Sequence, residues 1–172
     1  WTAVDDLQPD DNAGAGMMGF SSFDSACFYR YARIDWHGLC ETLGDAPLAR
    51  RTVSGFLQAA IAAVPSGKQN SHAAYNPPSF LLGVVRRDGM AWSLANAFEQ
   101  PVSPDRQGGL VRPSVAALDH YWGRLCGVYG GNTLAAVAAL GLDDDLPLEA
   151  LTPHLEATQA AWLARLLAAL EE

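Results

Sequence analysis

The sequence FLLGVV, from Phe80 to Val85, predicts a buried β-strand because it is a short, unbroken apolar run. Turn residues bound the run on both sides. Pro77-Pro78 precedes it, and Asp88-Gly89 follows as a two-residue hairpin turn. This turn predicts that the chain returns as a second strand from Met90 to Phe98. The first expectation is therefore an antiparallel strand pair.

Upstream of this strand, the sequence indicates a helix from Ala46 to Val64. Pro47 occupies its first turn and Pro65 closes it, as prolines do at helix boundaries. Apolar residues recur at helical spacing and would pack on the sheet, which leaves Arg50, Arg51 and Gln58 nearer the rim. The apolar stripe consists of Val53, Phe56, Leu57, Ala60, Ile61 and Val64.

Residues Cys27 to Asp35, CFYRYARID, alternate between two sets of side chains, which predicts a further strand. Asp35 is placed to cap a short helix from Trp36 to Leu43, which Gly44 would end. The two sets are Cys27, Tyr29, Tyr31 and Arg33 on one face, and Phe28, Arg30, Ala32 and Ile34 on the other.

Strand, helix, strand and strand, in this order, are typical of half of a ferredoxin-like, or RRM-like, sheet. The predicted fold class is therefore α+β, with an antiparallel sheet and helices packed on one of its faces. A chain of 172 residues and 18.3 kDa suits one domain. The predicted core residues are Phe28, Phe56, Leu57, Ile61, Leu81 and Val84.

The C-terminal third predicts more helix. Pro113 starts a helix from Ser114 to about Tyr129. Residues 132–142 are rich in alanine and fit a strand or a helix, with a strand favoured because an aspartate turn follows. A last helix is expected over 148–170, with a possible interruption at Pro153.

The N-terminal 26 residues predict a projecting hairpin or loop. Glycines flank a methionine pair, so the segment has no helical period and would present Met17, Met18 and Phe20. The chain begins at Trp1 without an initiator methionine, and we expect it to be part of something longer.

Composition favours a globular, cytoplasmic protein. Apolar residues make up 49% of the chain, yet no stretch approaches the roughly 20 apolar residues of a membrane span, and no signal peptide is evident. The three cysteines form no CxxC pair. The net charge is −8, but the window from Cys27 to Trp92 holds seven cations and four anions. This window could meet a polyanion, or its arginines could simply be solvated.

Motifs for catalysis and cofactors are missing. No G-x-S-x-G is present, and Ser66-Gly67-Lys68 fails the phosphate-loop pattern because Gln69 follows. His37 and Cys40 lack a second ligand pair at zinc spacing, and the triplet Asp143 to Asp145 fits a solvated turn. We therefore expect no catalytic residues, no metal and no cofactor.

A binding surface for RNA is the remaining hypothesis. Sheet aromatics beside a basic loop are how RRM-like modules hold single-stranded RNA, although tyrosines alternating on a strand also fit core packing. Glycine lets a backbone approach phosphate, lysine supplies charge, and amides supply donors, all independent of base sequence. The candidate residues are Gly67, Lys68, Gln69 and Asn70 in the loop, with Arg30 and Arg33 on the strand.

Five blocks taken together resemble the CasC family, the repeated backbone subunit of the type I-E CRISPR Cascade complex. They occur in the family's order and, with the residues around them, cover residues 1 to about 130. The blocks are Ala3-Val4-Asp5-Asp6-Leu7-Gln8, Phe28-Tyr29-Arg30-Tyr31-Ala32, Val64-Pro65-Ser66-Gly67-Lys68-Gln69, Ala73-Ala74-Tyr75-Asn76-Pro77 and Ser93-Leu94-Ala95-Asn96-Ala97-Phe98-Glu99.

The resemblance implies a non-catalytic subunit in antiviral defence, several copies of which form a helical filament along CRISPR guide RNA. Target DNA would be met through the guide, and other Cascade subunits would be partners. Residues 1–26 would be the thumb hairpin and its lead-in, with a tip at Met17, Met18 and Phe20. Residues 27–172 would be an RRM-like palm portion, the C-terminal part of a longer chain.

Two other functions stay open at this stage. One is a structural interaction domain whose acidic ends dock neighbouring proteins without touching RNA. The other is a nuclease of a related CRISPR family, which would need a catalytic histidine or carboxylate pair near the RNA face. His72 has no such partner close in sequence.

Overall fold

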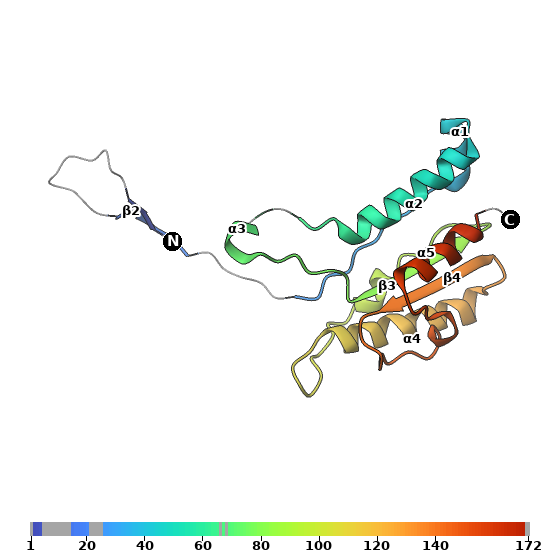
Figure 1. The fold of residues 1–172 in the computed structure, drawn as a ribbon. Helices are drawn as coiled ribbons and strands as arrows, with labels where there is room; N and C mark the ends of the chain where they lie inside the picture. The colour runs from blue at the N-terminus through green and yellow to red at the C-terminus, as the bar shows by residue number, and fades with distance from the viewer. Residues whose placement is uncertain (1, 5–14, 21–25, 66, 68, 171–172) are drawn as a thin grey trace.

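The computed structural model describes residues 2–4, 15–20, 26–65, 67 and 69–170. Its architecture is α+β, with an antiparallel strand pair between layers of helices (Figure 1). Over the described ranges, none of the helices combines the length and apolar composition that a bilayer span requires. In chain order the elements are β1 (Thr2–Val4), β2 (Ala15–Met18), α1 (Trp36–Leu43), α2 (Ala46–Ala62), α3 (Gln69–His72), β3 (Phe80–Arg86), the 3₁₀ helix η2 (Ala95–Phe98), α4 (Val111–Tyr129), β4 (Leu134–Gly141), the 3₁₀ helix η3 (Thr152–His154) and α5 (Gln159–Ala168).

β3 is the predicted buried strand, but its partner is β4 and not the segment 90–98. The strands run antiparallel, with Phe80 opposite Gly141. The predicted returning strand is wrong, because residues 90–98 form no strand and end in η2. This segment instead buries Leu94 in a cluster with residues of α4.

β4 confirms the strand expected over 132–142, and its composition explains its central place. Ala138 and Ala139 are fully buried, and their side chains belong to two different core clusters. Because successive side chains of a strand point to opposite faces, helices cover both faces of β4. Small side chains allow these helices to approach closely.

The expectation of helices on one face is therefore wrong. Figure 1 shows α4 on one side of the β3–β4 pair and α2 with α5 on the other. The core cluster on the α4 side contains Leu94, Leu118, Trp122, Val137, Ala139 and Leu151. The cluster on the α5 side contains Ala138, Trp162 and Leu166, with Leu57, Ile61 and Leu81 packed against it.

The first two long helices form where their capping residues predict. The Asp35 carboxylate accepts a hydrogen bond from the Gly38 amide at 3.1 Å, and Gly44 ends α1 in the left-handed conformation at φ 64°. The Asp45 carboxylate caps α2 through the Leu48 amide at 2.8 Å, with proline in the first turn. Local sequence thus sets these boundaries.

The last predicted helix is much shorter than expected. Only Gln159–Ala168 forms α5, and the Thr158 hydroxyl caps it by accepting from the Ala161 amide at 3.1 Å. The residues before it lie beside β4 instead: Leu155 bridges Ala139, and the Glu156 amide donates to the Ala139 carbonyl at 2.8 Å. The outer edge of β4 is thereby covered.

The strand predicted from Cys27 to Asp35 is not formed. Residues 26–35 are irregular, and most of their side chains are exposed. The core prediction fails with it, since Phe28 is 76% exposed. Phe56 and Val84 are also exposed, at 42% and 37%, so three of the six predicted core residues are wrong.

β1 and β2 form an antiparallel hairpin that lies apart from the helices in Figure 1. Met17 pairs with Ala3, and Met18 pairs with Thr2. The two methionines therefore belong to a strand of a hairpin, as the sequence predicts, and the assignment of the thumb tip stays a prediction. Phe20, after the strand, is almost fully exposed. The connecting residues 5–14 lie outside the described residues.

We expect Gly83→Ala to destabilise the fold by about 1–3 kcal/mol, as overpacked core substitutions do. A Cβ at Gly83 would clash with Leu166 Cδ1 and would lie 2.9 Å from Trp162 Cζ2. Gly127 in α4 is the matched control, because a Cβ there meets nothing within 4 Å and alanine favours a helix. Urea denaturation of both variants checks this, and a Gly83→Ala protein as stable as the parent would contradict it.

Candidate nucleic-acid interface

The segment 26–35 is held to the fold by two neighbouring side chains. The Tyr29 hydroxyl accepts a hydrogen bond from the Leu94 amide at 3.0 Å, and its ring lies 5.6 Å from that of Phe98. Arg30 Nη1 donates to the Ala63 carbonyl at 3.2 Å. Ala63 is the C-cap of α2, where the unpaired carbonyls favour a cation. Arg30 thus joins this segment to the end of α2.

The predicted basic loop follows directly from that helix end. Gln69 Nε2 donates to the Pro65 carbonyl at 2.7 Å and to the Ala74 carbonyl at 3.5 Å. Ala73 adopts a left-handed conformation, φ 48°, at the turn after α3. The Gln69 side-chain amide therefore closes its own loop through these two hydrogen bonds, and its predicted contact with RNA stays a prediction.

The structure brings only some of the predicted RNA-binding residues together. Arg30 contacts the helix end from which the loop starts, and Gly67 and Asn70 are exposed in that loop. Arg33 is exposed three residues beyond Arg30. Lys68 lies outside the described residues. The hairpin residues Met17, Met18 and Phe20 lie away from this surface in the chain, on or after β2.

Sequence reasoning missed an arginine stacked on aromatic rings. Arg86 Cζ lies 4.1 Å from the centre of the Trp92 ring, and Arg86 Nη2 donates to the Thr133 hydroxyl at 2.8 Å. Trp92 in turn contacts the rings of Trp122 and Tyr129. The strand predicted from Met90 to Phe98 did not indicate this contact, because Trp92 lies on a segment that forms no strand.

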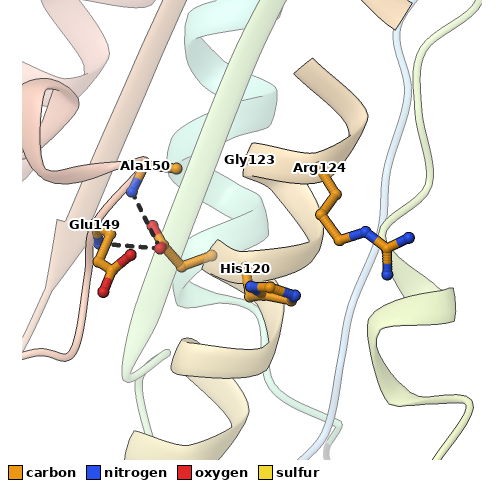
Figure 2. A pocket seen from close by; sticks show the side chains of 6 residues that line it. His120, Gly123, Arg124, Glu149 and Ala150 are labelled. Atoms are coloured by element: carbon orange, nitrogen blue, oxygen red, sulfur yellow. Dashed lines mark hydrogen bonds between the residues drawn. The ribbon is translucent and has the colours of Figure 1, made fainter. Parts of the chain in front are cut away.

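A shallow pocket on α4 is organised by a buried carboxylate (Figure 2). Asp119 is 3% exposed and accepts hydrogen bonds from the amides of Glu149, Ala150 and Leu151, at 2.9, 3.1 and 2.8 Å. Its oxygens are therefore taken up by the backbone. His120, labelled in Figure 2, is exposed on the same helix. The Asp119 carboxylate therefore holds the 149–151 loop against α4, and we call this contact the Asp119 clamp.

Two of the three aspartates at 143–145 form ion pairs with one arginine of α4. Arg112 donates to the carboxylates of Asp143 and Asp145. The Asp145 amide and the Arg112 guanidinium lower the pKa of Asp143, and the hydrogen bond to Asp143 raises the pKa of Arg112. These charges therefore hold the chain after β4 against the start of α4.

A groove between α1, α2 and α5 is lined by the three rim residues expected from the sequence. Arg50 and Arg51 line it beside Gln58, with Leu167 and Leu170 on the α5 side. The groove confirms that these α2 side chains lie at the rim of the helix packing. It offers cations on a second surface, away from the loop that follows α2.

Solved structures with the same fold come from RNA-guided assemblies. A chain of a "CRISPR RNA-guided surveillance complex" matches with a TM-score of 0.84 and 32% identity, covering 98% of this chain and 63% of that one. A chain of a "CRISPR RNA-guided surveillance complex, pre-nicking" matches with a TM-score of 0.83 and 32% identity, covering 99% and 45%. This chain thus spans less than two thirds of either.

The fold therefore defines a subunit class found in CRISPR surveillance complexes. The family model described as CT1975-like protein matches residues 1–167. The chain belongs to this family of Cascade backbone subunits, which confirms the resemblance seen in its sequence blocks. No curated protein matches the chain.

Proposed function

We propose that this chain is part of a non-catalytic subunit that binds CRISPR guide RNA and forms the backbone of a Cascade effector complex. The observation that carries this function is the match over 98% of the chain, at 32% identity, to a chain of an RNA-guided surveillance complex. Several copies would line up on one guide, beside other Cascade subunits of a type I-E complex. Target DNA would be recognised through the guide.

The residues that support RNA contact lie at the end of α2. Arg30 fixes the extended segment there, and Arg33 and Asn70 are exposed on either side of that junction in the chain. Cations and amides without base-specific geometry suit a protein that must hold any guide sequence. From the sequence we assign Gly67 and Lys68, which follow α2 in the chain, to the same RNA-binding site. The site would belong to an RRM-like palm, with residues 1–26 as the thumb.

Copurification tests the proposed function directly. We expect the complete protein, purified from cells that carry its CRISPR array, to retain RNA of one length class. Extraction and sizing of the bound RNA measure this. Protein that carries no RNA, yet still assembles with other subunits, would instead support a structural interaction domain.

We expect Lys68→Ala and Arg33→Ala each to weaken guide-RNA binding severalfold, about equally for unrelated guide sequences. Each should also reduce the slope of log affinity against log salt by about one. Arg106→Ala is the matched control, because Arg106 is an exposed arginine on the separate turn before α4. Titrations at two salt concentrations decide. Unchanged affinity and slope in both variants would remove this surface from the RNA site.

A further inference from the structure

The edge of β4 that lies away from β3 is covered by residues 152–156, which we call the edge strap. Leu155 bridges Ala139 in the parallel direction, and the Glu156 amide donates to the Ala139 carbonyl at 2.8 Å. η3, at the start of the edge strap, also contacts β4. A covered edge is closed to pairing with another strand. The edge strap therefore protects the backbone of β4 at a place where the faces of the strand are already buried.

One arginine of α5 ties the edge strap to the rest of the fold. Arg165 Nη1 donates to Glu156 Oε1 at 2.8 Å, and Arg165 Nη2 lies 3.3 Å from His154 Nδ1. The guanidinium thus contacts two side chains of the strap, one on each side of Leu155. Because α5 packs against β4 through buried Trp162 and Leu166, Arg165 is itself held in place by the core.

The contact with Arg165 fixes the protonation state of His154. A guanidinium has only N–H donors, so the Nδ1 atom of the imidazole must be the acceptor. The ring is therefore neutral, with its proton on Nε2. Protonation of Nδ1 would remove the acceptor and place a second cation against the arginine.

The charged groups that face His154 are few. Arg165 comes from α5 and Glu156 from the edge strap itself, and the Glu156 carboxylate is already bonded to the arginine. β4, against which η3 packs, consists of uncharged residues only. Burial and the charge of Arg165 lower the pKa of His154 below its ordinary value of 6.5.

The direction of this shift determines how closure of the edge strap depends on pH. The folded state binds a proton at His154 less readily than the unfolded chain does. The contribution of neutral His154 to closure is therefore complete above the ordinary pKa of 6.5 and is lost as the pH falls below it. Histidine is the side chain whose charge ordinarily changes in this range.

We propose that His154 and Arg165 form a pH-sensitive switch that holds the edge strap on β4 while the imidazole is neutral and releases the strap when the ring is protonated. Release would uncover the outer edge of β4 without disrupting the clusters on its faces. This switch goes beyond the proposed RNA binding and does not depend on it.

Hydrogen exchange in the complete natural polypeptide tests the switch. After correction for the intrinsic exchange rate, we expect the protection of the Glu156 amide to fall about threefold or more between about pH 7.5 and about pH 5.5. The indole N–H of Trp162, bonded to the Ala138 carbonyl in the core, should keep its protection. Constant protection at Glu156, or an equal loss at Trp162, overturns a local release of the edge strap.

Two histidine variants separate this switch from other effects of acid. His154→Gln keeps an acceptor for Arg165 and does not titrate in this range, so the Glu156 amide should be equally protected at both pH values. His120→Gln is the matched control, because His120 is an exposed histidine of α4, and it should retain the pH response of the parent protein. A response that persists in His154→Gln, or disappears in His120→Gln, contradicts the assignment to His154.

Nuclear magnetic resonance of the imidazole nitrogens gives a readout that does not depend on exchange. At about pH 7.5 we expect an unprotonated Nδ1 and a protonated Nε2 in His154, with a titration midpoint below 6.5. Arg165→Gln removes the neighbouring cation and should raise that midpoint. A proton on Nδ1 at this pH, or a midpoint that Arg165→Gln does not raise, overturns the proposal.

Discussion

Asp119→Ala is expected to lower the free energy of unfolding by about 3–5 kcal/mol, a large part of the total stability of a domain. The carboxylate accepts from three backbone amides of the 149–151 loop, and that of Leu151 is buried. Each buried donor left without an acceptor costs about 1–3 kcal/mol. Urea denaturation followed by circular dichroism measures the loss.

Asp144→Ala is the control for Asp119→Ala. It removes an exposed aspartate that makes no hydrogen bond with its side chain among the described residues, so we expect a change within about 0.5 kcal/mol. A loss below about 1 kcal/mol in Asp119→Ala would show that the loop does not depend on the clamp. The loss of stability in Asp119→Asn should lie between those of Asp119→Ala and Asp144→Ala, because the amide oxygen of asparagine keeps part of the acceptor capacity.

Trp162→Ala is expected to cost about 3–5 kcal/mol on the opposite side of the sheet. Trp162 is 4% exposed, and its indole Nε1 donates to the Ala138 carbonyl at 2.9 Å inside the cluster beside α5. Truncation removes the ring that fills this layer and leaves a buried carbonyl unpaired. The same denaturation experiment measures the effect.

Two variants define what Trp162 contributes. Trp162→Phe keeps most of the apolar volume and loses the donor, so we expect a smaller cost of about 1–3 kcal/mol. Leu142→Ala shortens a side chain that is 70% exposed and should change stability by less than about 0.5 kcal/mol. Equal stability of Trp162→Ala and Leu142→Ala would contradict the described packing.

Elements set by local interactions were predictable from the sequence. The cap residues Asp35 and Gly44 mark α1 correctly, since their hydrogen bonds and backbone conformation involve near neighbours only. β3 was also predictable, because its apolar run is short and bounded by turns. The partner strand of β3 was not predictable. The turn at Asp88-Gly89 favours pairing with the next segment of the chain, and the sequence pattern does not show that the distant β4 is preferred.

Residues 27–35 also show that a sequence pattern does not identify the partner of a strand. Side-chain alternation predicts extended backbone, but a strand also requires a neighbour that supplies hydrogen bonds. No described segment supplies one here. The alternation of side chains therefore does not establish that a strand forms. Because a paired strand was assumed, Phe28 was wrongly assigned to the core.

The hydrogen bonds within the candidate site were not predictable from the sequence, and its role in RNA binding stays a prediction. A basic loop was expected after the 46–64 helix, and Arg30 indeed reaches that helix end. Gln69 bonds the carbonyl of Pro65 four residues before it, a local alternative that its residue type also permits. Asp119 was missed, although it follows Leu118 on the buried stripe of α4, where a charged residue signals a partner.

The Asp119 clamp has a consequence for how this protein can change over evolution. Its carboxylate accepts hydrogen bonds from main-chain amides only, so the side chains at 149 and 150 make no contribution to these hydrogen bonds. Relatives that keep the clamp are free to vary at 149 within the limits of solubility, while proline is barred from 149 to 151 because it has no N–H. We therefore expect relatives that keep this contact to retain an acidic residue at position 119 and to lack proline from 149 to 151.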